Sequence, residues 1–195
     1  MRQQSNIFLS VHNGYKGVPY GRSDERSDGS KNHGFKPLRE NLNDIGAIPE
    51  AQDIPALKNA LAVLNDPASM FFTVGCEKAF GANTSGHWVN GYLEFAFNYC
   101  ELVADAPFYF KLFFAFNQWY WKLESKPSVR YNFELEAAHF VKANASGMTM
   151  SIWIATGISP TKEAAQSAWE QGVATVVGFL KQQGVPPESH YTRIY

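Results

Sequence analysis

Two stretches of the chain repeat apolar residues at helical spacing. In residues 53–66, Ile54, Leu57, Leu61 and Leu64 recur every three or four positions, and a proline stands in the first turn. An Asp-Pro pair ends the stretch. This pattern predicts a short amphipathic helix near the start of the folded region.

The second helical stretch lies near the C-terminus. It opens at Ser159-Pro160, a capping residue followed by a first-turn proline, and it closes at Gly184 before two prolines. Its apolar stripe consists of Ala165, Trp169, Val173, Val176 and Leu180. The spacing predicts a long helix with one buried face.

Between these helices the pattern favours strands, separated by turn signals such as GANTSG and NASG. The five strand-like segments are Met70–Glu77, Trp88–Leu102, Phe108–Leu123, Val129–Phe140 and Met148–Ala155. Parallel neighbours need a long crossover, and these connections are short. We therefore predict an antiparallel meander in chain order.

The second and third segments are too long to lie flat, because a residue in a strand advances about 3.3 Å. Asn90-Gly91 is a strong hairpin signal, but a turn there leaves too short a strand before it, so we predict a β-bulge. The predicted fold class is α+β: a curled five-stranded antiparallel sheet with a short N-terminal and a long C-terminal helix packed on one face.

The third segment, FYFKLFFAFNQWYWKL, has aromatic rings at both parities. Alternate residues of a strand point to opposite faces of the sheet. One parity is purely apolar, as in Phe108, Phe110 and Leu112, and we assign it to the core. The other parity mixes rings with charges, which is too polar for a core and too aromatic for an ordinary solvent face.

We call this second surface the aromatic–polar face and predict that it binds a ligand or forms an interface. Its candidate residues are Tyr92, Glu94, Lys111, Phe113, Asn117, Trp119, Trp121, Arg130, Glu134 and Trp153.

Residues 1–50 form a polar arm before a single α+β domain at residues 51–195. The part from 12 to 50 is rich in Gly, Ser, Asn, Asp, Arg and Lys, so we expect it to be irregular or disordered. Only Ile7–Val11 reads as a strand, which could dock onto the domain. The N-terminal residues lack the apolar core of a secretory signal, and no apolar run is long enough to span a membrane.

The charge composition of the chain argues against some classes of binding partner. Lysine and arginine number 17, aspartate and glutamate 18, and the net charge is −1, so no strong field gathers nucleic acid or an anionic membrane. The spacing of Cys76 and Cys100 does not match a metal-binding motif, and we interpret them as free thiols in a reducing compartment. We expect a cytoplasmic protein that binds neither metal nor cofactor.

Catalytic patterns are weak. Glu134 and Glu136 share a face about 7 Å apart, a spacing that suits acid–base work but is more typical of a solvated strand. Glu94 lies among rings, where its pKa could rise, or where it could pair with Lys111 or Arg130 across the sheet. We assign no catalytic residue.

The main functional hypothesis is a non-catalytic binding or assembly domain that self-associates as a homodimer, or binds a small ligand, through the aromatic–polar face. The alternative is an enzyme or small-molecule carrier with a pocket on that face that uses Glu94, Glu134 or His139. Single-stranded nucleic acid could stack on the rings, but the glutamates of the face would repel phosphate, so we expect no such partner.

Overall fold

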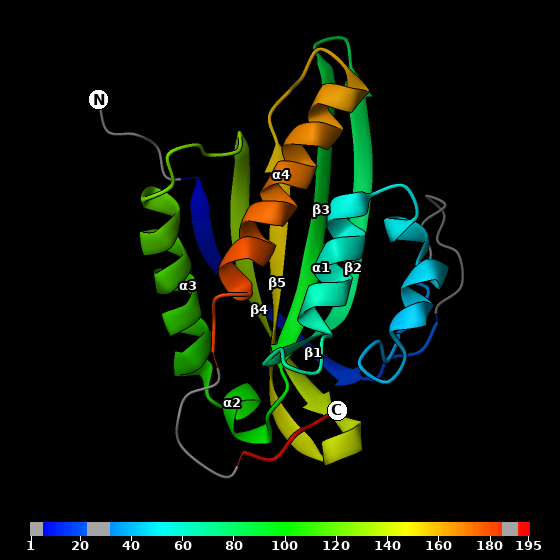
Figure 1. Ribbon diagram of the computed structural model, residues 1–195, viewed down its shortest axis with the longest axis vertical. Helices are drawn as coiled ribbons and strands as arrows, with labels where there is room; N and C mark the ends of the chain where they lie inside the picture. Colours follow the sequence, from blue (N-terminus) through cyan, green and yellow to red (C-terminus); the bar gives the residue numbers. More distant parts are fainter. Residues whose placement is uncertain (1–5, 23–31, 185–190) are drawn as a thin grey trace.

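The computed structural model describes residues 6–22, 32–184 and 191–195, and Figure 1 shows the arrangement of its elements. The strands are β1 (Ile7–Val18), β2 (Phe71–Asn83), β3 (Gly86–Phe97), β4 (Val129–Phe140) and β5 (Ala145–Thr156). The α-helices are α1 (Pro55–Leu64), α2 (Cys100–Ala104), α3 (Ala106–Trp121) and α4 (Lys162–Leu180). Short 3-10 helices are η1 (Leu42–Ala47), η2 (Pro49–Ala51) and η3 (Val141–Ala143).

The protein is α+β, and its five strands form one mixed sheet in the order β1-β4-β5-β3-β2. The strands β2 and β3 form one antiparallel hairpin, and β4 and β5 form another. The strand β5 pairs with β3, whereas β1 runs parallel to β4 at the edge. The predicted antiparallel meander in chain order was therefore wrong: the sheet is mixed, with β1 and β2 as its edge strands.

The largest correction concerns residues 108–123, which were expected to be a strand and instead lie mostly in helix α3. A proline stands in the first turn of α3. Its buried residues, Tyr109, Leu112, Phe113, Phe116 and Tyr120, recur every three or four positions, which is the period of a helix rather than a strand. Nearly every position of this stretch holds an apolar residue, and most of these are aromatic. The alternation of a strand and the period of a helix therefore both fit the sequence, and packing selected the helix.

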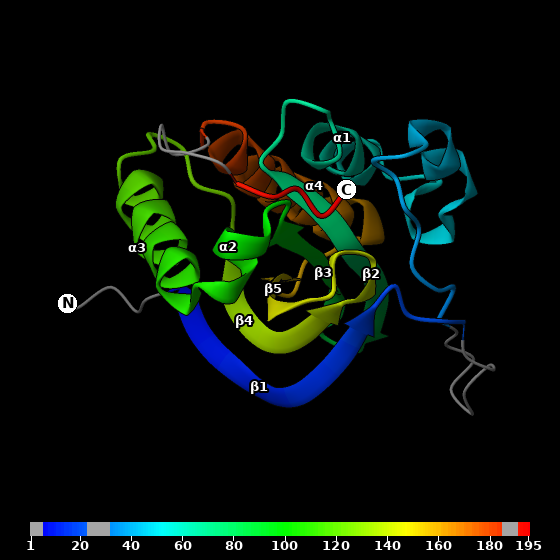
Figure 2. The ribbon, with the colours of Figure 1, turned by 90° about the horizontal axis from the view of Figure 1, so that it is seen from below.

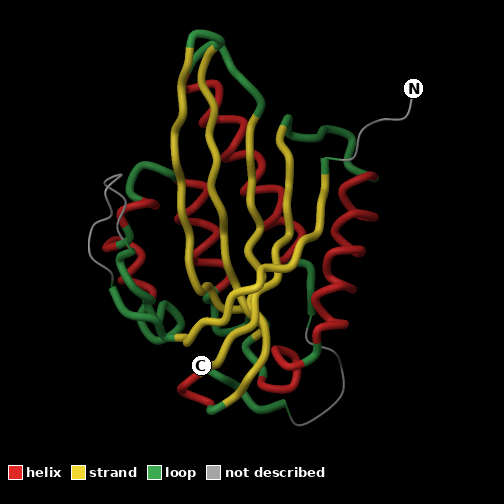
Figure 3. Tube along the Cα trace, turned by 180° about the vertical axis from the view of Figure 1, so that it is seen from behind, coloured by secondary structure: helices red, strands yellow, loops and turns green. Residues whose placement is uncertain are grey.

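The two predicted amphipathic helices are present as α1 and α4. The side chain of Thr161, rather than that of Ser159, caps α4 by accepting a hydrogen bond from the Ala164 amide at 3.1 Å. Both helices pack on one face of the sheet (Figure 1). Figure 3 shows the opposite face, with these helices behind the strands.

The helix α4 approaches the sheet closely through a glycine. A Cβ on Gly172 would stand 2.8 Å from Cγ2 of Ile154. The hydroxyl of Tyr131 donates to the Gly172 carbonyl at 3.2 Å, and Nε1 of Trp169 donates to the Ile154 carbonyl at 3.0 Å. These two buried rings tie α4 to β4 and β5.

Alternation along β3, β4 and β5 follows the predicted faces. On β4, Tyr131, Phe133 and Leu135 are fully buried on the helical side. Of the residues that alternate with them, Arg130 is exposed, and Asn132 and Glu134 are half-buried. The helix α3 lies at the β1 and β4 side of the molecule (Figure 2). It contributes Phe113 and Phe116 to the same core, where both rings contact Phe133.

The strand expected at Ile7–Val11 continues to Val18, with a shift of register between His12 and Tyr15. A second bulge interrupts β2 between Thr73 and Gly75. Pairing is regular at Asn90-Gly91, where the bulge was predicted.

Of the polar segment after β1, residues 19–22 and those from 32 onward are described, while residues 23–31 lie outside the described part of the expected arm. Its described part lies against the edge strand β2. Nη1 of Arg39 donates to the carbonyls of Ser69 and Phe71 at 3.0 and 2.8 Å, which satisfies part of the β2 edge. The remaining gap between this segment and β2 forms a pocket.

Candidate functional site

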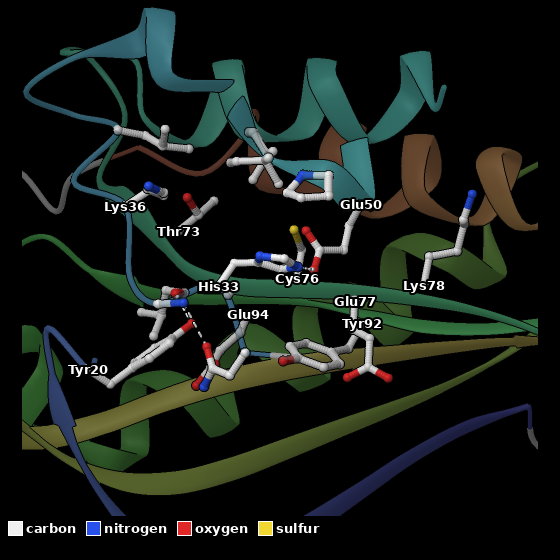
Figure 4. A pocket seen from close by; sticks show the side chains of 18 of the residues that line it. Tyr20, His33, Lys36, Glu50, Thr73, Cys76, Glu77, Lys78, Tyr92 and Glu94 are labelled. Carbon is white, nitrogen blue, oxygen red and sulfur yellow. Dashed lines mark hydrogen bonds and ion pairs between the residues drawn. The ribbon is translucent and has the colours of Figure 1, made fainter. Parts of the chain in front are cut away.

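The pocket lies at the edge of the sheet, around the bulge of β2, and has a volume of about 710 Å³. Its walls come from the end of β1 and Tyr20 after it, the segment 32–50, the strands β2 and β3, and Glu136 of β4 (Figure 4). A volume of this size lies within the range of small-molecule sites.

Gly75, at the β2 bulge, makes the inner end of the pocket possible. A Cβ on this residue would stand 2.9 Å from the Tyr20 hydroxyl, 3.3 Å from Oε2 of Glu94 and 3.6 Å from the Tyr92 hydroxyl. Figure 4 shows the Glu94 carboxylate between the two tyrosines. Three polar groups from β3 and from the segment after β1 therefore converge where the bulge has no side chain.

Glu94 is the buried member of a charge cluster. Its relative exposure is 3%, and its Oε1 accepts from Nζ of Lys16 at 2.5 Å. The same ammonium lies 2.5 Å from Oε2 of Glu136, whose Oε1 is 3.2 Å from Nδ1 of His12. Two carboxylates thus share one lysine, so these three groups carry a net charge of −1 when all are ionised.

Burial alone would lower the pKa of Lys16. The charges and hydrogen bonds of Glu94 and Glu136 outweigh that effect and raise the pKa above its ordinary value. Lys16 therefore stays an ammonium at neutral pH.

The neutral acids beside the cluster keep their protons. Burial, reinforced by the negative charge of Glu94, raises the pKa of Tyr20 and of Tyr92. Burial also raises the pKa of the Cys76 thiol to about 12, with Glu50 and Glu77 adding to the shift. At neutral pH the two phenols are hydrogen-bond donors, and Cys76 is a thiol rather than a nucleophilic thiolate.

The outer wall of the pocket is also charged. His33 and Glu50 approach within 4.0 Å, and Lys36, Glu77 and Lys78 lie around them. Figure 4 shows His33 and Glu50 beside Cys76, while Glu77 and Lys78 point to opposite sides of β2.

One buried hydroxyl near the cluster lacks a partner in the described structure. Oγ1 of Thr149 makes no hydrogen bond although the residue is 1% exposed. Thr149 is the register partner of Glu136 on the neighbouring strand. A buried polar atom of this kind usually binds water or a ligand group.

The structure brings only two of the ten predicted site residues, Tyr92 and Glu94, into this pocket. Glu94 pairs with Lys16 and not, as was expected, with Lys111 or Arg130. The predicted glutamate pair also divides, because Glu136 lines the pocket and Glu134 does not.

Three further predicted residues lie on the same sheet face as Tyr92 and contact their own neighbours. The rings of Tyr92 and Trp153 are 4.7 Å apart, and Nε1 of Trp153 donates to Oε1 of Glu134 at 3.2 Å. The Arg130 guanidinium lies 5.1 Å from the ring of Phe8.

The other five candidates belong to α3, because their assignment to a strand was wrong. They are Lys111, Phe113, Asn117, Trp119 and Trp121. Phe113 is buried in the core, and Trp119 packs against Phe179 with ring centroids 5.5 Å apart. These side chains do not join the aromatic–polar face.

Lys16 and Tyr20 were missed because the arm was read as irregular beyond Val11. The alternation of Ile7, Leu9 and Val11 was the signal that could have extended the strand, although a register shift then interrupts it. His139, named for the alternative enzyme, lies 3.4 Å from Oγ of Ser146 and is not part of the pocket wall.

Within the described parts of the chain, no three His, Cys, Asp or Glu side chains gather closely enough to hold a metal ion. Among the described residues, no helix is long and apolar enough to span a membrane. No family model, curated protein or solved structure matches this chain.

Proposed function

We propose that this chain is a non-catalytic binding protein that holds a small organic amine, as its ammonium ion, in the pocket beside β2. The observation that carries the proposal is the state of Glu94. Oε1 of this buried carboxylate accepts a hydrogen bond from Lys16, while Oε2 faces the space left open by Gly75. A buried carboxylate oxygen is stabilised by a donor, and a charged donor binds most strongly.

The charge of the inner pocket favours a cation over an anion. Lys16 neutralises only one of the two carboxylates, Glu94 and Glu136, that it contacts. The rings of Tyr20 and Tyr92 also line the pocket, and aromatic faces attract ammonium groups. The lining as a whole has four carboxylates, those of Glu50, Glu77, Glu94 and Glu136, and three ammonium groups, those of Lys16, Lys36 and Lys78, so its formal charge is also negative when these groups are ionised.

Binding without chemistry fits the groups present better than the enzyme alternative does. Of the three residues named for that alternative, Glu94 lines the pocket, whereas Glu134 and His139 do not. The one thiol in the pocket wall, Cys76, is held neutral by burial.

The test compares benzylamine with benzyl alcohol, which has a hydroxyl in place of the ammonium. Isothermal titration calorimetry should detect binding of the amine and none of the alcohol at the same concentration. Glu94→Gln should weaken amine binding by tenfold or more, in keeping with about 1.5–3 kcal/mol for a hydrogen bond to a charged group.

Glu134→Gln is the matched control. Glu134 lies on the same sheet face but is held by Trp153 outside the pocket, so the substitution should leave amine affinity unchanged. The proposal fails if neither compound binds, if the alcohol binds as tightly as the amine, or if the control weakens binding as much as Glu94→Gln.

A further inference from the structure

The outward side of α3 carries a largely apolar ridge, which we define as the apolar residues Pro107, Phe110, Phe114 and Trp121 with the polar Gln118. Phe110, Phe114 and Trp121 are 37%, 58% and 46% exposed. The five residues recur every three or four positions, so they lie on one side of the helix. The opposite side of α3 packs into the core through Phe113 and Phe116.

A helix that is apolar on both sides is normally covered on both sides. The described residues of this chain cover only the inner side of α3, which lies at the periphery of the molecule (Figures 1 and 2). Large aromatic residues are also the type most enriched at the centres of protein interfaces. The ridge therefore has the composition of an interface.

The charges at the two ends of α3 identify the occupant. Asp105 precedes the first turn, whereas Lys122 and Lys126 follow the last, with Glu124 between them. Between these ends Lys111 is the only charged residue. One end is thus acidic and the other is basic overall, so an antiparallel copy of the same helix complements both.

We propose that two copies of this chain associate through an antiparallel contact of their α3 ridges, related by a two-fold axis near Phe114. The axis sets Phe114 against Phe114 of the second copy, and Pro107 against Trp121. Asp105 then comes within reach of Lys122 of the second copy, and Lys111 faces Asn117 rather than another lysine. Antiparallel helices also align their dipoles favourably.

This contact is independent of the ligand pocket, because α3 contributes none of the pocket wall. It also differs from the dimer surface expected on the sheet face, since the ridge residues belong to a helix beside that sheet.

A charge exchange tests the two-fold contact. Sedimentation equilibrium should show a wild-type mass that doubles as the concentration rises toward the millimolar range. Asp105→Lys alone, and Lys122→Glu combined with Lys126→Glu, should each raise the dimer dissociation constant by about tenfold or more, because like charges then meet across the axis.

An equimolar mixture of the two variants should dimerise again, because one acidic end then meets one basic end on each side. Lys58→Glu, on α1 beyond α4, is the control and should dimerise like the wild type. Circular dichroism checks that each variant retains its helices. Phe114→Ser, which changes an exposed residue, should abolish the dimer in a folded chain.

A wild-type chain that stays monomeric up to millimolar concentration would overturn the proposal, and so would a mixture that stays monomeric when both variants are folded. A monomer that co-sediments with phosphatidylglycerol vesicles through the same ridge would also overturn it and assign α3 to a lipid surface.

Discussion

At the residue scale, the pocket depends on a missing side chain and a shared lysine. Gly75 leaves room for Glu94 and two phenols, and Lys16 lies between the buried carboxylate of Glu94 and the half-buried carboxylate of Glu136. Burying one carboxylate beside another is costly unless a cation lies between them. The same groups that stabilise this corner of the fold therefore define its chemistry.

Gly75→Ala should leave the chain folded but prevent ligand binding. The new methyl group would stand 2.9 Å from the Tyr20 hydroxyl, which is itself held by the Val74 carbonyl at 2.8 Å. We expect about 1–3 kcal/mol of destabilisation, as is typical of overpacking, and loss of amine binding in calorimetry.

Gly157→Ala is the control for this substitution, because a Cβ at Gly157 would meet nothing within 4 Å. If Gly75→Ala bound the amine as tightly as this control, the inner end of the pocket would not be the ligand site.

At the element scale, α3 has two faces with different roles. Phe116 is fully buried and contacts the rings of Tyr120, Tyr131, Phe133 and Phe179. Its neighbour Phe114, two residues earlier, is 58% exposed. One helix thus anchors the core and also presents an apolar surface.

Phe116→Ala and Phe114→Ala should therefore separate these roles. Urea denaturation should show a loss of about 3–5 kcal/mol for Phe116→Ala, which leaves a cavity. Under conditions where the chain is monomeric, Phe114→Ala should change stability by less than about 0.5 kcal/mol. Equal losses for the two variants would contradict the assignment of the faces.

At the scale of the whole molecule, stability should decrease as the pH rises above neutral. Burial raises the pKa of Cys76 to about 12 and also raises the pKa of Tyr20, Tyr92 and Tyr109. In the unfolded chain these groups ionise near their ordinary values, about 8.5 for cysteine and 10 for tyrosine. The unfolded state then binds fewer protons than the folded state, so the free energy of unfolding decreases.

Lys16 changes stability in the same direction. Its raised pKa means that its contribution is complete below the ordinary lysine value and disappears as the pH rises through the folded value. Urea denaturation between pH 7 and 11 should show a continuous decline. Cys76→Ala should reduce the decline below about pH 10, where Cys100, whose pKa is also raised by burial, still contributes, and the tyrosines should add to the decline from about pH 10. A stability that stays constant across this range would refute the assignment.

The sequence by itself determined the elements in which the spacing of apolar residues fits only a helix or only a strand. The stripe from Ala165 to Leu180 specified α4, and the strict alternation from Val129 to Leu135 specified β4 and its two faces. It also placed Tyr92 and Glu94 on the face opposite the helices. Each of these patterns depends on local periodicity, which a single sequence records.

Only the tertiary structure decided the rest. Residues 108–123 are apolar at both parities, so the helix was selected by packing of Phe113 and Phe116 against Phe133. Because α3 lies between β3 and β4 in the chain, β4 does not pair with β3. Instead β5 lies between them in the sheet, and β1 pairs parallel to β4 at the edge. That pairing carried Lys16 to Glu94, a contact between residues 78 positions apart that no local pattern in the sequence encodes.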